Sequence, residues 1–204
     1  MKLYWHPVSL MPWRVRIALA EKGLAYEEVM IDLPGGESHS PEFLVLNPFG
    51  QVPVLEDDGR AFAESTAILE YLEESHPRPA LMPAAAAARA EVRQLMCWSN
   101  GPWMMSWKRW VGPASLGFPD TEDVRTQGRA ELEHHLTLLV ARLERSAWLA
   151  GDYSLADICY APLVLMAGRM GLSAEGPGQA AIDGWLDRLR ARPAVQAAMG
   201  PILG

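Results

Sequence analysis

The chain has 204 residues, of which half are hydrophobic and 21% charged, a composition typical of a globular protein with a sizeable core. Its formal net charge is −7, which argues against the basic surface that a nucleic-acid-binding protein needs. No apolar run reaches the roughly 20 residues of a membrane-spanning helix. Neither nucleic acid nor a membrane is an expected partner.

The two cysteines, Cys97 and Cys159, form no C-x-x-C motif and no metal-ligand cluster. Both stand among apolar neighbours, as small core residues do. A disulfide framework and a bound metal are therefore not expected. The expected location is a reducing, cytoplasmic compartment. The N-terminus has the pattern of a short strand and not that of a signal peptide.

Short strands and helices alternate over the first 76 residues. Residues 2–5 and 27–31 are rich in aromatic and β-branched side chains, which predicts two strands. Residues 13–22 between them show apolar pairs at i, i+4, which predicts a helix. Pro12 is expected to start this helix and Gly23 to end it. A strand, a crossover helix and a second strand imply a parallel pair.

The second half of this region predicts a hairpin followed by a helix. Residues 52–56 and 60–63 are strand-like and flank an Asp-Gly turn, which indicates an antiparallel pair. Ser65 is expected to cap the final helix. The order β-α-β-α-β-β-α predicts an α/β domain over residues 1–76, with a mixed sheet and helices on both faces.

Prolines at 77–83 predict a linker, and only helices are expected over residues 84–204. These helices are residues 84–110, interrupted at Gly101-Pro102, then 124–145, 154–170, 180–190 and 193–199, with a loop at 113–121. Ser154-Leu155-Ala156-Asp157 has the form of a capping box. The helix that it opens is apolar nearly all round, so we expect it at the centre of an all-α bundle.

Val52-Pro53 is the first candidate for a binding site. If this peptide bond is cis, the main chain of Val52 can turn outward and present its N–H and C=O to an extended peptide. A trans proline opening an edge strand is the more common arrangement, and the residues alone leave both open.

Glu64-Ser65 and Ser9 are two further candidates at helix starts. A helix N-terminus offers free N–H groups and a partial positive charge to a carboxylate. Ser65 alone could equally be a simple helix cap. Ser9 lies between the first strand and the first helix, where its hydroxyl could donate to an anion, although most loop serines have no such role.

Together these segments resemble the cytosolic glutathione transferase family. WRVRIALAEKG at 13–23, NPFGQVPVLEDDG at 47–59 and ESTAILEYLEE at 64–74 are similar to the N-terminal domain of its phi and zeta classes. YSLADICYAPLV at 153–164 is similar to the capping-box helix of its C-terminal domain. The resemblance covers essentially the whole chain and implies a thioredoxin-like domain followed by an all-helical one.

The resemblance assigns roles around glutathione, the implied cosubstrate. Val52 and Pro53 match the residues that pair with its cysteinyl part, and Glu64 and Ser65 match the pair that holds its γ-glutamyl end. Two further residues correspond to glutathione-binding positions, Gln51 along the tripeptide and His39 near the glycine carboxylate. A solvent-exposed histidine is an equally good interpretation of His39.

The resemblance also identifies the activating group. The tyrosine-type classes would need a tyrosine where this chain has Trp5, and the beta-class cysteine would fall on Leu10. Ser9 aligns with the serine of the phi, theta and zeta classes, and is therefore the implied catalytic residue. Zeta proteins carry Ser-Ser-Cys-Ser where this chain has Ser9-Leu10-Met11-Pro12, a departure that argues against maleylacetoacetate isomerase activity.

A glutathione transferase conjugates the activated thiol to a hydrophobic electrophile, commonly in detoxification. Leu10 and Met11, with Trp103 and Trp107 from the helical domain, are expected to line the pocket for that electrophile. Packing in an interdomain core is the more common fate of such a tryptophan-rich stripe. A homodimer is a family expectation.

Two alternatives stay open at this point. A glutathione-binding scaffold without turnover is one, because this fold also carries non-enzymatic proteins. The other is glutathione-dependent isomerisation, peroxide reduction or dehalogenation. The residues do not identify the electrophile.

Overall fold

The structure is a computed structural model that describes residues 1–112, 117, 119–174 and 176–203. It consists of two compact units, Met1–Leu81 with Arg190–Gly204, and Met82–Leu189. The chain passes from the first unit to the second inside the predicted linker at 77–83. Residues 190–204, predicted as part of the helical domain, group with the first unit.

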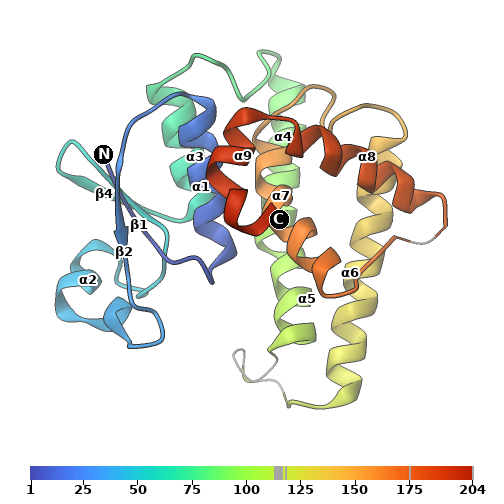
Figure 1. The fold of residues 1–204 in the computed structure, drawn as a ribbon, viewed down its shortest axis with the longest axis horizontal. Helices are drawn as coiled ribbons and strands as arrows, with labels where there is room; N and C mark the ends of the chain where they lie inside the picture. The colour runs from blue at the N-terminus through green and yellow to red at the C-terminus, as the bar shows by residue number, and fades with distance from the viewer. Residues whose placement is uncertain (113–116, 118, 175, 204) are drawn as a thin grey trace. The chain divides into compact units, whose positions relative to one another are not determined.

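The first unit contains a four-stranded sheet and the helices packed on it (Figure 1). Its elements are β1 (Lys2–Trp5), α1 (Leu10–Glu21), β2 (Glu27–Met30), the short 3₁₀ helix η1 (Glu37–His39), α2 (Pro41–Leu46), β3 (Val54–Asp57), β4 (Arg60–Ala63), α3 (Ser65–Ser75) and α9 (Pro193–Leu203). The predicted order β-α-β-α-β-β-α is confirmed for residues 1–75.

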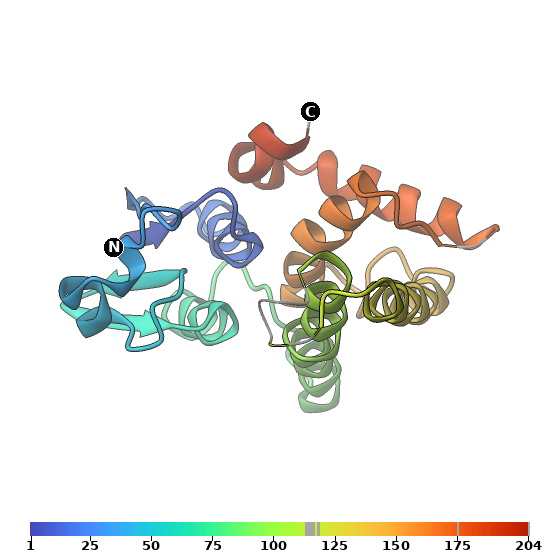
Figure 2. The ribbon, with the colours of Figure 1, turned by 90° about the horizontal axis from the view of Figure 1, so that it is seen from below.

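The sheet is mixed, with the strand order β2-β1-β3-β4. β1 and β2 run parallel, whereas β3 is antiparallel to both β1 and β4. This is the arrangement expected from a crossover helix followed by a hairpin. Helices α1 and α3 lie on one side of the sheet and α2 on the other (Figures 1 and 2). The prediction of helices on both faces is confirmed.

Helix α1 begins at Leu10, two residues before the predicted start at Pro12. The first amides of a helix have no intrahelical partner, so a proline is tolerated in the first turn after other residues have opened it. The early start makes Ser9 the N-cap residue of α1. This places the candidate hydroxyl at a helix N-terminus.

A buried ion pair between Lys22 and Glu73 holds the segment that follows α3 in place. The Lys22 ammonium at the end of α1 lies 2.8 Å from the Glu73 carboxylate and donates to the carbonyls of His76 and Pro79. Glu73 also accepts from the Leu81 amide at 3.0 Å. Because both charged side chains are almost fully buried, the pair fixes where the chain leaves the first unit.

Helix α9 packs on α1 as part of the first unit. Arg192, just before α9, donates two hydrogen bonds of 2.7 and 2.8 Å to the Glu21 carboxylate at the end of α1. Val195 on α9 is fully buried. The first unit therefore combines the two ends of the chain.

The second unit is entirely helical within the residues that the structure describes. It comprises α4 (Ala86–Asn100), α5 (Pro102–Val111), α6 (Glu122–Leu143), α7 (Leu155–Arg169) and α8 (Gly178–Arg190), which ends at the unit boundary. The break predicted at Gly101-Pro102 separates α4 from α5. Part of the loop predicted at 113–121 lies outside the described residues.

Helix α7 is the buried centre of this unit, as its apolar sequence predicted. The Asp157 carboxylate in its first turn accepts from the Leu149 amide at 3.0 Å, the Ser154 amide at 3.0 Å and the Trp185 indole at 2.9 Å. Burial raises the pKa of Asp157 to about 6, although these donors act in the opposite direction. The capping box therefore also links α7 to α8 and to the preceding loop. Among the described helices, none combines the length and the apolar character that spanning a membrane requires.

Candidate functional site

The pairing of the strands brings the predicted site segments together. Tyr4 near the end of β1 pairs with Val54 at the start of β3, and Val54 pairs with Ala63 at the end of β4. Pro53 directly precedes β3, and Glu64 directly follows β4. The loop to Ser9 also leaves from this edge of the sheet. Ser9, Pro53 and Glu64, which are far apart in the sequence, therefore come from loops at the same end of the sheet.

The Val52–Pro53 peptide bond is cis. Val52 lies just before β3, and neither its N–H nor its C=O is hydrogen bonded to another described residue. A residue with both main-chain groups free can pair with an extended peptide in the antiparallel manner. This pair of free groups is what the sequence analysis expected of a cis bond at this position.

Asn47, to which the sequence analysis gave no role, shapes the turn before Val52. Its buried side chain donates to the Gln51 carbonyl at 2.7 Å and accepts from the Phe49 amide at 3.1 Å. Such local hydrogen bonds are the usual way in which asparagine fixes a turn. The motif Asn-Pro-Phe-Gly-Gln was a sequence signal for this role.

His39 lies next to this same turn. Gly50 has φ 61°, and a Cβ there would lie 2.9 Å from the Ser38 carbonyl oxygen and 3.1 Å from His39 Nε2. Only glycine fits this approach without a shift of the neighbours. The close packing brings the exposed His39 ring beside Gly50, one residue before the exposed Gln51. His39 and Gln51 thus share one rim of the first unit.

Glu64 and Ser65 form the start of α3. Glu64 is the N-cap residue with φ 69° and ψ 111°, a conformation that non-glycine residues rarely adopt, and its side chain makes no cap hydrogen bond. Strained residues of this kind concentrate at functional sites. Ser65 is buried, and its hydroxyl donates to the Met11 sulfur across a 3.9 Å contact. Met11 therefore connects the beginnings of α1 and α3.

Ser9 stands at the N-terminus of α1 with an unused hydroxyl. Its amide donates to the His6 carbonyl at 3.1 Å, but its side chain makes no cap hydrogen bond and none to another described residue. Ser9 is half-buried, and the Trp13 indole donates to the carbonyl of Pro7 in the loop before it, at 3.1 Å. The adjacent Leu10 is buried, with 8% of its surface exposed.

Arg14 is a further charged group that the sequence analysis left without a role. It is fully buried on α1, and its Nη1 donates to the Ser65 hydroxyl oxygen at 3.4 Å. Its spacing was a usable signal, because Leu10 at i−4 and Ala18 at i+4 put it on an apolar stripe. A positive charge thus lies behind the start of α3.

The two tryptophans predicted for the electrophile pocket belong to the helical unit. Trp103 is fully buried and packs against Tyr160 and His135, with ring centroids 5.6 and 5.9 Å apart. Trp107 is 9% exposed and contacts Trp110 edge to face. All of these partners belong to the helical unit, and the assignment of both tryptophans to the electrophile pocket stays a prediction.

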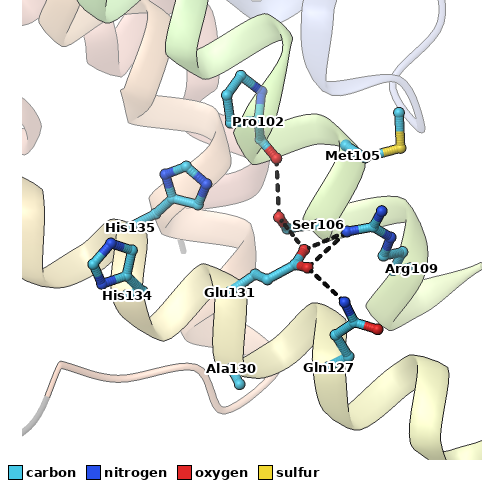
Figure 3. Close-up of a pocket in the computed structure, with 9 residues that line it drawn as sticks. All are labelled: Pro102, Met105, Ser106, Arg109, Gln127, Ala130, Glu131, His134 and His135. Atoms are coloured by element: carbon cyan, nitrogen blue, oxygen red, sulfur yellow. Dashed lines mark hydrogen bonds and ion pairs between the residues drawn. The ribbon is translucent and has the colours of Figure 1, made fainter.

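A hollow of about 550 Å³ lies between α5 and α6 and contains none of the predicted site residues (Figure 3). Ser106, Arg109 and Gln127 all donate to the Glu131 carboxylate within it, at 2.7–3.0 Å. Burial would raise the pKa of Glu131, but the hydrogen bonds from Ser106 and Arg109 outweigh it and hold the pKa below its usual value. The ionised carboxylate is thus fully engaged in joining the two helices. No cluster of three or more potential metal-binding side chains occurs among the described residues.

Comparison with known proteins agrees with the geometry of both units. Residues 1–74 match the family model described as glutathione S-transferase, N-terminal domain, and residues 107–193 match glutathione S-transferase, C-terminal domain. Maleylacetoacetate isomerase of Rattus norvegicus is 41% identical over 174 residues, 82% of this chain and 78% of the relative. Glutathione S-transferase 3 of Zea mays is 34% identical over 99% of this chain and 94% of its own length.

A solved structure extends the likeness to three dimensions. The crystal structure of a maleylacetoacetate isomerase from Methylobacterium extorquens, with bound malonate and glutathione, has a TM-score of 0.81 and 33% identity. The match covers 97% of this chain and 95% of the other. The matched domains, the full-length relatives and the shared fold together establish that this chain belongs to the cytosolic glutathione transferase family.

Proposed function

We propose that the protein is a glutathione-dependent enzyme that uses the Ser9 hydroxyl to stabilise the glutathione thiolate for attack on a hydrophobic electrophile. The observation that carries this proposal is the unused Ser9 hydroxyl at the N-terminus of α1, at the same edge of the sheet as the free main chain of Val52. A serine at an N-cap ordinarily bonds to its own helix. Here the hydroxyl stays available to a ligand.

The surrounding groups match the functional groups of glutathione from one end to the other. The N–H and C=O of Val52 suit the cysteinyl main chain, and Pro53 fixes that segment. The helix N-terminus at Ser65 suits the γ-glutamyl carboxylate, while the Glu64 carboxylate suits the ammonium beside it. His39 and Gln51 suit the glycine end, where the tripeptide carries its second carboxylate.

The energy required of Ser9 is modest. A free thiol has a pKa near 8.5, so roughly 3% is ionised at pH 7. A hydrogen bond from Ser9 and the partial positive charge of the α1 N-terminus both favour the thiolate. A pKa lowered by about two units would correspond to about 2.7 kcal/mol and make most of the bound glutathione nucleophilic. Leu10 and Met11 supply apolar surface next to that thiolate.

Ser9→Ala tests the proposal, with conjugation of an aryl halide followed from pH 6 to 9. We expect glutathione affinity to change less than about threefold, and kcat at pH 7 to fall by about 10- to 100-fold because the thiol is protonated. The loss should shrink towards pH 9. Ser9→Thr keeps a hydroxyl and serves as the control. Conjugation by Ser9→Ala at the wild-type rate at pH 7 would exclude Ser9 as the activating group.

Glutathione-dependent isomerisation of maleylacetoacetate is the second candidate. Its support is the 41% identity to the rat enzyme of that name. Against it stand Leu10, Met11 and Pro12, where zeta proteins carry a serine, a cysteine and a serine. Both reactions begin with thiolate addition, but an isomerase returns its glutathione unchanged. Stable thiol concentration during turnover of maleylacetoacetate would favour the isomerase, and thiol consumption with an electrophile the transferase.

The same assays distinguish an enzyme from a scaffold that binds glutathione without turnover. Retention on immobilised glutathione without reaction across a broad electrophile panel would support the scaffold and overturn the enzyme. The homodimer is proposed from family membership, and light scattering of the purified protein tests it.

A further inference from the structure

Arg14 is a buried cation at the start of α3, and its environment needs an explanation. The side chain is fully buried on α1, where an arginine is stable only if its charge is hydrogen bonded or paired. One of its contacts is the Ser65 hydroxyl, 3.4 Å from Nη1. Ser65 is the first residue of α3, so the charge lies directly behind that helix N-terminus.

The contact with Arg14 controls the direction of the Ser65 hydroxyl. A serine hydroxyl has one hydrogen and two lone pairs, whereas an arginine can only donate. Since Arg14 occupies a lone pair, the hydrogen of Ser65 must point elsewhere, and it points to the Met11 sulfur at 3.9 Å. A thioether is a weak acceptor, so a carboxylate can replace it readily.

We infer that Arg14 is a positioning residue for the γ-glutamyl carboxylate of glutathione, acting through the Ser65 hydroxyl that it holds as a donor. The inference rests on the proposed function. The partial positive charge of the α3 N-terminus favours an anion at the same place. The burial of the guanidinium keeps it from competing for the ligand directly.

Arg16 provides a matched control on the same helix. It lies two residues further along α1 and pairs with the Glu28 carboxylate at 2.8 Å. Its guanidinium also stacks over the rings of Trp5 and Trp13, 4.1 and 4.8 Å from their centroids. Arg16 thus has the charge and helix of Arg14 but makes its contacts with β2 and the aromatic pair.

The experiment measures binding of two thiols, glutathione and cysteinylglycine, to wild type, Arg14→Gln and Arg16→Gln by calorimetry. Cysteinylglycine lacks the γ-glutamyl group and therefore the carboxylate that Ser65 would hold. We expect Arg14→Gln to raise the Kd of glutathione about tenfold or more, and to leave the Kd of cysteinylglycine within about twofold. Arg16→Gln should leave both within about twofold.

Enzyme kinetics supply a second readout that loss of packing would not mimic. In Arg14→Gln the KM for glutathione should rise, while kcat at saturating glutathione and its pH dependence stay as in wild type. A Ser65→Ala background should remove most of the effect of Arg14→Gln, because the two act on one hydroxyl.

Two results would overturn the inference: wild-type affinity of Arg14→Gln for glutathione, or an equal loss of affinity for both thiols. If circular dichroism shows that Arg14→Gln is unfolded, Arg14→Lys is judged by the same two criteria, with an expected rise in glutathione Kd of about threefold or more. Failure of wild type to bind glutathione would instead overturn the proposed function. The two failures are therefore distinguishable.

Discussion

The N-terminus of α7 in the helical unit and those of α1 and α3 in the first unit use capping residues in opposite ways. In the helical unit, the Ser154 hydroxyl accepts from the Ala156 amide at 3.3 Å and Asp157 accepts from the Ser154 amide, so the start of α7 is satisfied internally. In the first unit, Ser9 and Glu64 occupy the N-cap positions of α1 and α3, and neither side chain makes a cap hydrogen bond.

This difference separates residues that stabilise a helix from residues that remain available to a ligand. A cap that bonds to its own helix contributes about 1 kcal/mol to stability. A residue of the same type that forgoes this bond contributes little to stability, and a hydroxyl or carboxylate left free at a helix N-terminus can meet a bound molecule. The first pattern indicates a structural role for α7, and the second is compatible with the binding role proposed above for the starts of α1 and α3.

The largest expected effect comes from Asp157→Ala in the satisfied cap. The change leaves the amides of Leu149 and Ser154 and the indole of Trp185 without their acceptor in a buried site. We expect the free energy of unfolding to fall by about 3 kcal/mol or more, measured by urea denaturation. The exposed Asp152→Ala is the control, with an expected change of about 0.5 kcal/mol or less. Equal losses in both variants would contradict the comparison.

The same carboxyl should make stability depend on pH. The pKa of Asp157 rises from 3.8 to about 6 on folding, so the native state binds this proton more tightly than the unfolded state. The stabilisation that comes from this proton is fully present below about pH 4 and is lost as the pH rises through 6, a change of roughly 3 kcal/mol. The stability difference between wild type and Asp157→Asn, measured at pH 4 to 7, should fall accordingly. A carboxyl resonance of Asp157 that titrates near pH 4 would contradict this.

Glu64→Gly should separate stability from binding in the first unit. Glycine adopts φ 69° without the strain of a side chain, a gain of about 1–3 kcal/mol that is partly offset by its greater freedom in the unfolded state. We expect a net stabilisation of about 1 kcal/mol together with weaker glutathione binding. Asp58→Gly, at the positive φ of the hairpin turn, should leave glutathione binding unchanged. A Glu64→Gly protein less stable than wild type would exclude strain at this residue.

The smallest expected effect compares two serines at helix starts. Ser154→Ala should cost about 1 kcal/mol because it removes a cap hydrogen bond. Ser9→Ala should cost less than about 0.5 kcal/mol because no such bond exists. Thermal unfolding of the two variants side by side measures the difference. A larger loss in Ser9→Ala would mean that Ser9 serves the fold.

The local patterns were sufficient to predict most of the elements. Aromatic and β-branched composition predicted the strands of the first unit, and the crossover helix and the Asp-Gly turn predicted their mixed pairing. Gly101-Pro102 predicted the break between α4 and α5. The predicted start of α1 at Pro12 was wrong, because a proline is compatible with several positions in the first turn and the helix begins at Leu10. The grouping of α9 with the first unit depends on contacts with α1 that no local pattern encodes.

The candidate site was harder to predict from the sequence than the fold was. Ser9, Val52 and Ser65 each had an ordinary structural explanation, and only their joint resemblance to a family selected the other one. Arg14 and Asn47 were missed because their roles consist of hydrogen bonds to residues distant in sequence or to a turn of particular geometry. The strand register brings Ser9, Val52 and Glu64 to the same end of the sheet, and this register exists only in the folded sheet.

The packing of α9 on α1 has a consequence for synthesis on the ribosome. The sheet and α1–α3 are complete once Leu81 has emerged, yet the surface of α1 that α9 covers stays open until the whole helical unit has been translated. At about 5–20 residues per second, that interval is on the order of ten seconds. During it, the nascent first unit presents an uncovered apolar face, which is the kind of surface that chaperones bind.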